Sequence, residues 1–146
     1  MDVLKGKVAR ELAALEEELD EFLERTIGGG LRPASRVDRL RPPTDVCETE
    51  EGIVVQMELA GVRAEDLRLI VDGEYLQITG TREPPPPGSG GRYLQMEIPR
   101  GRFERVLRVG VPYDPDQVSA SVESGILTVV LPRKVRVLRK VPVSGS

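Results

Sequence analysis

Near the end of the chain, the stretch Ala120-Ser121-Val122-Glu123-Ser124-Gly125-Ile126-Leu127 joins two short apolar segments through a glycine turn. Val118, Ala120 and Val122 alternate with polar residues, as a strand with one buried face requires. Gly125 supplies a backbone conformation that a residue with a Cβ resists. The stretch therefore predicts a β-hairpin, whose second strand continues through residues 128–132.

Several short strands are predicted before this hairpin. One begins at Val46, and the others cover residues 53–59, 67–71, 75–78 and 103–109. The Asp72-Gly73 pair between the third and fourth segments is typical of a tight hairpin turn. Because no helical pattern separates these strands, the sequence predicts an all-β domain, an antiparallel immunoglobulin-like sandwich.

The first residues of the chain follow a helical pattern. Large apolar residues recur in alternating steps of four and three, at Val8, Leu12, Leu15, Leu19 and Phe22. We expect an amphipathic helix over residues 2–26, ended by the glycines at 28–30. Its basic residues come early and its acidic residues late, which opposes the helix dipole, so packing must stabilise it. The helix either lies on its own domain or pairs antiparallel with the helix of another subunit.

Length and composition predict one domain with two flanking arms. The chain has 146 residues, of which 39% are hydrophobic, and a net charge of −3. We divide it into a helical arm and linker at 1–40, a β-domain at 41–132 and a C-terminal extension at 133–146. The small net charge gives no electrostatic footprint for nucleic acid or an acidic membrane.

Cysteine usage and the lack of targeting patterns bear on location. Cys47 is the only cysteine, which excludes an internal disulfide and fits a reducing cytoplasm. There is no pattern of a secretion signal and no run of about 18 apolar residues. We therefore expect a cytoplasmic protein.

The sequence offers little for catalysis or for a cofactor. It contains no histidine, which removes the commonest general base and metal ligand. Neither glycine-rich stretch is followed by the Lys-Ser/Thr pair of a phosphate-binding loop. We predict no enzyme activity, no cofactor and no metal.

A proline- and glycine-rich segment interrupts the β-pattern. Residues 84–87 are four prolines, and glycines follow at positions 88, 90 and 91. Such a segment is a stiff spacer with a flexible joint. The strand candidate at 93–96 stands at its far end, so it need not pair within its own subunit.

Read in order, residues 42–132 resemble the alpha-crystallin domain of the small heat-shock proteins. The matching segments are Pro43-Thr44-Asp45-Val46-Cys47-Glu48-Thr49, Glu58-Leu59-Ala60-Gly61-Val62 with Glu65-Asp66-Leu67, Leu76-Gln77-Ile78-Thr79-Gly80-Thr81-Arg82, Gly101-Arg102-Phe103-Glu104-Arg105 and the stretch 120–127. Ala60, Thr81 and Gly110 depart from the family's usual proline, glutamate and proline. The first and last of these should loosen their turns.

The resemblance implies an ATP-independent holdase that assembles from swapped-strand dimers and binds partly unfolded proteins. The dimer interface would include Tyr93, Leu94, Met96 and Arg105, where the alternative for Arg105 is a solvated strand arginine. The signature turn would be Gly125, Ile126 and Leu127. The helical stripe Val8, Leu12, Leu15, Leu19 and Phe22 would serve assembly or client binding.

The C-terminal extension would carry an anchor for a neighbouring subunit. Val141, Pro142 and Val143 resemble the family's I-x-I/V anchor, whose groove would lie between Leu67 and Leu69 on one strand and Val118 and Ala120 on another. Residues 135–137 have the same spacing and compete for this role, although we favour 141–143. The extension is basic, so it is either solvated or attracted to the acidic part of the N-terminal arm.

A second function class uses a related sandwich. A CS-domain-like adaptor docks specific folded partners without protecting unfolded ones. The spacer, the strand at its far end and the C-terminal anchor argue against an adaptor, which needs none of them.

Overall fold

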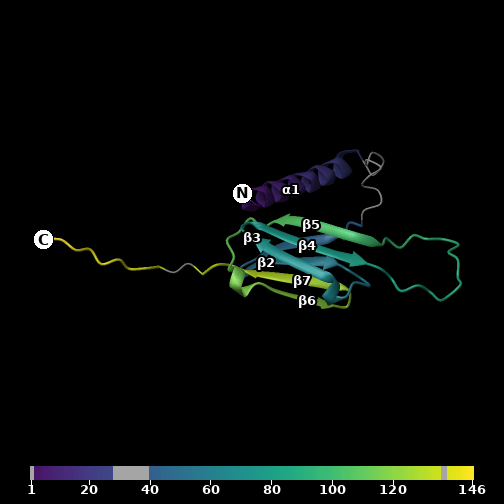
Figure 1. Ribbon diagram of the computed structural model, residues 1–146. Coiled ribbons are helices and arrows are strands. Elements are labelled where there is room, and N and C mark those ends of the chain that lie inside the picture. Colours follow the sequence, from purple (N-terminus) through teal and green to yellow (C-terminus); the bar gives the residue numbers. More distant parts are fainter. Residues whose placement is uncertain (1, 28–39, 136–137) are drawn as a thin grey trace.

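The computed structural model describes residues 2–27, 40–135 and 138–146, and the domain it contains is a two-layer antiparallel β-sandwich (Figure 1). One sheet has four strands in the order β1-β2-β7-β6 and the other has three in the order β3-β4-β5. The strands are β1 (Thr44–Thr49), β2 (Gly52–Glu58), β3 (Leu67–Asp72), β4 (Tyr75–Arg82), β5 (Gly101–Arg108), β6 (Ser119–Glu123) and β7 (Ile126–Pro132).

The strand pairing follows from the turns and from the apolar alternation. The β1–β2, β3–β4 and β6–β7 hairpins turn at Glu50–Glu51, at Gly73 and at Gly125, and both of these glycines have positive φ. The long ladder between β2 and β7 pairs Val55 with Val129 and joins distant parts of the chain. Two 3-10 turns, η1 (Ala64–Asp66) and η2 (Pro115–Gln117), precede β3 and β6.

The core lies between the two sheets. Side chains from β2, β4 and β7 fill it and are almost completely buried, among them Met57, Leu76, Ile78, Leu127, Val129 and Leu131. Gly80 lies opposite Phe103, and a Cβ there would stand 2.6 Å from the Phe103 ring. The glycine therefore makes room for the aromatic side chain at this end of the core.

Helix α1 (Asp2–Ile27) lies along β5 on the outside of the three-stranded sheet, while two segments project from the domain (Figure 1). The connection between β4 and β5 extends from one end, and the residues after β7 extend from the other. No helix in the described ranges has the length and apolar character needed to cross a membrane.

The structure confirms the predicted sandwich, with its N-terminal helix and extended C-terminal tail. Several strand ends differ. Strands β1 and β5 begin two residues before the predicted Val46 and Phe103, and β4 continues to Arg82, beyond the predicted end at 78. Residues 93–96 form no strand within the described chain, where we expected a strand that need not pair in its own subunit. The glycines at 28–30 and the linker to 39 lie outside the described residues.

Gly52 should tolerate no side chain, because it starts β2 at φ +148° and a Cβ would lie 2.2 Å from the carbonyl oxygen of Leu131. We expect Gly52→Ala to lower the free energy of unfolding by about 3 kcal/mol, from backbone strain and steric overlap together. Gly73→Ala is the matched control, since its φ of +57° adds strain but its Cβ would meet open space. Urea denaturation that gives both variants the same stability would contradict this account.

Candidate functional site

Arg105 is a buried charged residue that forms hydrogen bonds to several parts of the chain. It is 5% exposed, at the edge of the three-stranded sheet, where its guanidinium donates to the Pro42 carbonyl at 2.7 Å and to the Thr44 hydroxyl at 3.2 Å. Its Nε also donates to Glu17 Oε1 of α1 at 3.1 Å. The alternative of a solvated strand arginine is therefore wrong. In this chain the guanidinium joins β5, the segment before β1, β1 itself and the helix.

Helix α1 docks on the sheet through small and charged residues. Ala14 is buried against Tyr75 and Val106, with Ala13 beside it. Two further ion pairs flank this contact, between Arg10 and Asp72 and between Glu21 and Arg41, the second at 3.6 Å. The helix therefore lies on its own domain, with its orientation set by paired charges around a small apolar contact.

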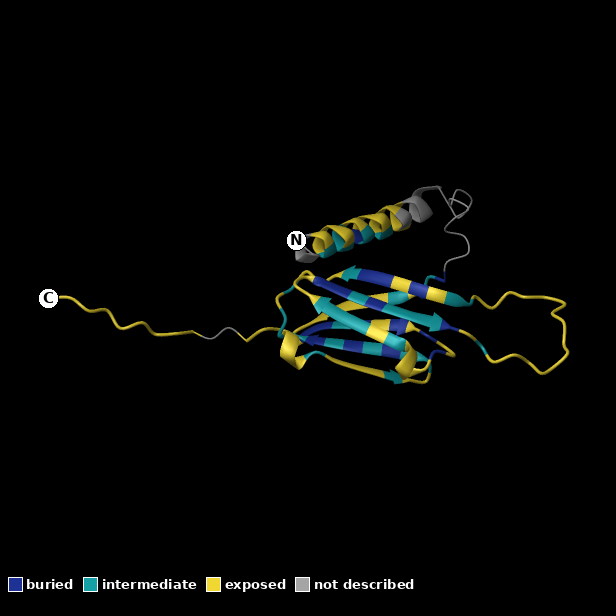
Figure 2. Cartoon of the chain, viewed as in Figure 1, coloured by how far each residue is buried: buried dark blue, intermediate teal, exposed yellow. Residues whose placement is uncertain are grey.

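The apolar stripe of α1 belongs to its exposed residues, which Figure 2 shows on the side of the helix away from the domain. Its five members are between 53% and 61% exposed and consist of Val8, Leu12, Leu15, Leu19 and Phe22. This follows from helical geometry, because Ala14 and Glu17 stand on the side opposite the stripe. The expectation that the helix lies on its own domain thus needs one correction. The face that contacts the domain is the one with Ala14 and Glu17, and not the apolar stripe.

Glu17 carries the electrostatic cost of this docking. Burial raises the pKa of its carboxyl above the ordinary 4.5, although the charge of Arg105 and the hydrogen bond from the Val106 N–H act in the opposite direction. The Val106 N–H donates to Glu17 Oε1 at 3.3 Å. A partly desolvated carboxylate therefore sits between two donors of β5.

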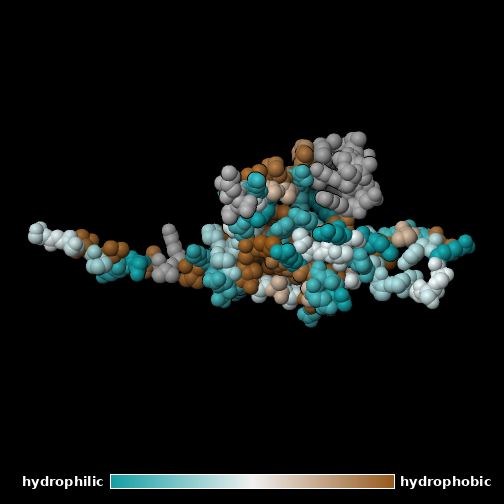
Figure 3. All heavy atoms as spheres, in the orientation of Figure 1, coloured by the Kyte–Doolittle hydropathy of each residue, from teal (hydrophilic) through white to brown (hydrophobic). Residues whose placement is uncertain are grey.

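The predicted anchor groove involves the outermost strands of the two sheets. Strand β3 ends one sheet and β6 ends the other, so each has one unpaired backbone edge. Leu67, Leu69 and Val118 are partly buried against the core, and Ala120 is exposed. Figure 3 shows apolar surface on this face of the sandwich. These edges have the polar groups and apolar side chains that an added extended segment needs.

The signature turn at Gly125 contacts the end of β2. Gly125 has a φ of +76°, and its carbonyl accepts a hydrogen bond from the Leu59 N–H at 2.7 Å. A Cβ at this position would stand 3.2 Å from the Cα of Ala60. Leu127 is buried in the core, whereas Ile126 is partly exposed. The turn thus holds the β6–β7 hairpin against the end of β2.

The connection between β4 and β5 presents apolar side chains to solvent. Tyr93, Leu94 and Met96 are exposed, Leu94 at 88%, and Ile98 beside them is exposed as well. The guanidinium of Arg100 lies 5.4 Å from the centre of the Tyr93 ring, a cation–π contact. The predicted dimer strand is therefore available for pairing outside its own chain.

The C-terminal tail leaves the domain at Arg133. This residue contacts Glu48 at 3.2 Å through its side chain, and its N–H donates to the Glu51 carbonyl. Beyond Lys134 the described residues are exposed, with Val141 at 72% and Val143 at 96%. Positions 136–137 of the competing anchor lie outside the described residues.

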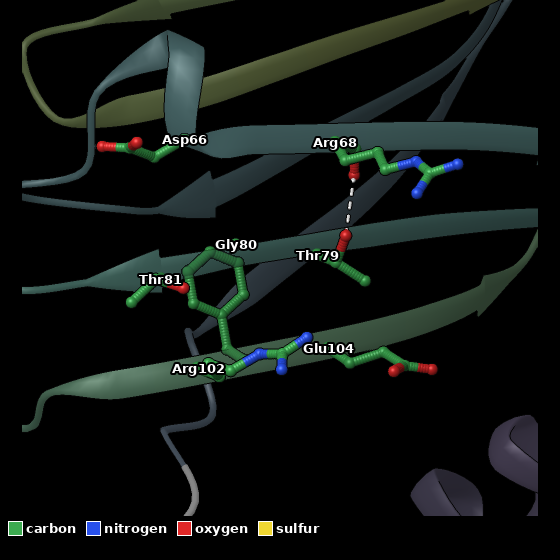
Figure 4. Close-up of a pocket in the computed structure, with 8 residues that line it drawn as sticks. Asp66, Arg68, Thr79, Gly80, Thr81, Arg102 and Glu104 are labelled. Atoms are coloured by element: carbon green, nitrogen blue, oxygen red, sulfur yellow. Dashed lines mark hydrogen bonds between the residues drawn. The ribbon is translucent and has the colours of Figure 1, made fainter.

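A shallow hollow of about 530 Å³ lies on the outer face of the three-stranded sheet (Figure 4). It is lined by backbone, threonines and charges of both signs, namely Asp66, Arg68, Thr79, Gly80, Thr81, Arg102, Phe103 and Glu104. The described residues hold no group of three or more side chains suited to a metal ion. The open and mixed character of the hollow resembles an ordinary sheet surface more than a ligand pocket.

Sequence reasoning missed the residues that dock the helix. Glu17 and Arg105 are separated by 88 positions, and Arg10 and Asp72 by 62. A signal was present in Ala13 and Ala14, two small residues opposite the stripe, where a helix can approach a sheet closely. It was outweighed by the larger apolar residues of the stripe.

Comparison with known proteins places these features in a family. The model of the Hsp20/alpha crystallin family matches residues 45–144. The chain is 30% identical over 113 residues to small heat shock protein C2 of Rickettsia felis, covering 77% of this chain and 73% of that protein. Heat shock protein 16.0 from Schizosaccharomyces pombe is 28% identical, with a TM-score of 0.62 over 73% of this chain and 100% of that one. A small heat-shock protein from Xylella fastidiosa shares the fold at 24% identity, with a TM-score of 0.64 over 73% and 99% of the two chains.

Helix docking should depend on pH through Glu17. Because the docked carboxyl has a raised pKa, docking is stabilised fully below pH 4.5, and this contribution is lost as the pH rises through the raised value. In Glu17→Gln this dependence should disappear, while the amide oxygen can still accept from Arg105. Urea titrations followed by helical circular dichroism at several pH values check this. The same pH profile in both proteins would contradict it.

Proposed function

Since the chain belongs to the Hsp20/alpha-crystallin family of chaperones, we propose that it is an ATP-independent holdase that assembles with copies of itself and binds partly unfolded proteins. The family is non-enzymatic, and the proposed activity needs no cofactor. The lone cysteine, Cys47, is exposed and suits a reducing compartment, so we place the activity in the cytoplasm.

The observation that carries this proposal is the distribution of apolar side chains. The core residues of the sandwich are buried, yet most of the exposed large apolar residues lie on α1, on the connection before β5 and on the tail. Contiguous exposed apolar surface of this kind marks an interaction site. A chain built in this way has surfaces for its own copies and for unfolded proteins.

The building block that we propose is a swapped-strand dimer. Strand β1 is a sheet edge with mostly exposed residues, and it can pair with residues 93–96 of a second copy. Each added backbone hydrogen bond contributes about 0.5–1.5 kcal/mol net. A short strand with two symmetric copies of the contact therefore supports a durable dimer. Arg105, beside the start of β1, would lie near this interface.

Higher assembly would use the tail anchor. In an extended segment Val141 and Val143 point the same way, and Pro142 between them restricts the backbone. Burial of two valines gives about 3–5 kcal/mol gross, which is comparable to the entropy lost on association. A single tail thus binds weakly, and many tails on one assembly hold it through effective concentration. The Xylella fastidiosa relative is described as having a distinct high order structure.

Clients would bind where apolar surface becomes free. The α1 stripe and the surface between β3 and β6 both tolerate many sequences, because neither depends on specific polar partners. Phe22 is the only aromatic residue of the N-terminal arm. Either the surface between β3 and β6 takes a larger part in client binding than in relatives with aromatic arms, or client capture is weaker.

The proposed function predicts protection without nucleotide. We expect the chain to suppress light scattering by a heat-aggregating model protein at about equimolar subunits, equally with and without ATP. An unrelated soluble protein at the same mass concentration is the control. No suppression would refute the holdase and favour an adaptor that docks specific folded partners.

The tail anchor predicts a local effect on the sheet edges. In the assembled protein, Val141→Ala with Val143→Ala should speed hydrogen exchange of the β3 and β6 amides and lower the native mass, because about 0.8 kcal/mol is lost per buried methylene or methyl group. Val135→Ala, the control for the competing anchor, should leave that exchange unchanged. Loss of protection only in the Val135 variant would assign the anchor to residues 135–137 instead.

A further inference from the structure

The stripe on α1 is an apolar surface that its own domain cannot cover while the helix is docked. The opposite face is held by Ala14 against the sheet and by the Glu17–Arg105 pair, so turning the helix would leave a buried guanidinium without its carboxylate. The stripe is also narrow and straight, since steps of four and three average the spacing of a coiled-coil seam. A partner that covers the stripe must therefore be narrow and apolar, and it must come from outside the domain on which α1 is docked.

From Glu11 onward the borders of the stripe are mostly acidic, and this restricts that partner. Glu11, Glu16 and Glu18 each stand one position from a stripe residue, and Glu18 is exposed; Lys7, beside Val8, pairs with Glu11 at 3.9 Å. Helices that lie on anionic membranes carry basic residues in such places, so a membrane fits poorly. A second α1 gives a mixed charge match, because an antiparallel pair with Leu12 opposite Leu15 puts both Lys7 and Glu11 near Glu18 of the partner.

The tail of this chain has the complementary chemistry. Val135 and Leu138 are 81% and 88% exposed, and they stand among basic residues. Lys134, Arg139 and Lys140 supply positive charge beside them. Figure 3 shows apolar and polar residues succeeding one another along this projecting segment. Apolar residues with basic neighbours match an apolar stripe with acidic neighbours in hydropathy and in charge.

We propose that the tail residues Val135, Leu138, Arg139 and Lys140 of a second copy bind the α1 stripe. The occupant is a second copy because the tail is fixed to its own domain at Arg133 and Lys134 and then runs away from α1 (Figure 1). This contact rests on the proposed self-association. It is distinct from the anchor at 141–143, and an unfolded client gains the stripe by displacing the tail.

The contact can be tested by cross-linking two forms of the full chain, both with Cys47→Ser. One carries Leu15→Cys on the stripe and the other carries Leu138→Cys on the tail. After mixing, a short bis-maleimide should give a product between the two chains, in higher yield at low salt than at about 1 M salt, where the Debye length is about 3 Å. Ala64→Cys, exposed on η1, replaces the stripe cysteine in the control and should give little product.

Charge reversal tests the acidic border directly. Glu18→Lys on the first chain should lower the cross-linking yield by about two- to fivefold, and Arg139→Glu on the second should restore it. A cross-linking yield that neither charge reversal changes would overturn the proposal. It is also overturned if the Leu15→Cys chain alone cross-links equally well, which indicates helix pairing, or if a chain with both cysteines, diluted in cysteine-free chains, cross-links within itself.

Native mass distinguishes failure of the tail contact from failure of the self-association on which that contact rests. Assembled protein that gives no product, or gives one only between Leu15→Cys and an added client, refutes the tail contact alone. Protein that stays monomeric under the same conditions refutes the proposed self-association.

Discussion

The buried charge of Arg105 organises this molecule. The Arg105 guanidinium lies inside the edge of the sandwich, where an isolated charge would be costly, so the chain must bring acceptors to it. Pro42 and Thr44 supply neutral oxygens, and Glu17 supplies the opposite charge. Because Glu17 belongs to α1, the hydrogen bonds that it accepts from Arg105 and Val106 fix which face of the helix meets the domain, and thereby which face meets solvent.

That orientation connects the fold to the proposed chaperone activity. A helix that buried its leucines on its own sheet would add stability and leave the arm without an interaction surface. Here the contact is limited to Ala14 with its neighbours and to ion pairs, of which Arg10–Asp72 and Arg41–Glu21 are partly exposed and individually weak. The domain gains a positioned helix, while the large apolar side chains of the stripe stay on its exposed side.

Much of the fold could be predicted from the sequence, because strands and turns leave local marks. Gly73 and Gly125 locate two hairpins, and the alternation around Val55 and Val129 identifies the buried faces of two central strands. The orientation of α1 could not be predicted in this way. Apolar residues usually turn inward, and the reason for the reversal is the Glu17–Arg105 pair, whose members lie far apart along the chain. The resemblance singled out Arg105, but a single sequence does not reveal its partner.

The order β1-β2-β7-β6 also constrains how the protein is made. Strand β2 lies in the middle of its sheet, yet its neighbour β7 is synthesised after all the other strands that the structure describes. A ribosome must therefore release the chain through Pro132 before the central ladder can close, and pairing between such distant segments is slow. Until then the nascent chain exposes an apolar strand edge, so a protein proposed to shield others from aggregation passes through a vulnerable state of its own during translation.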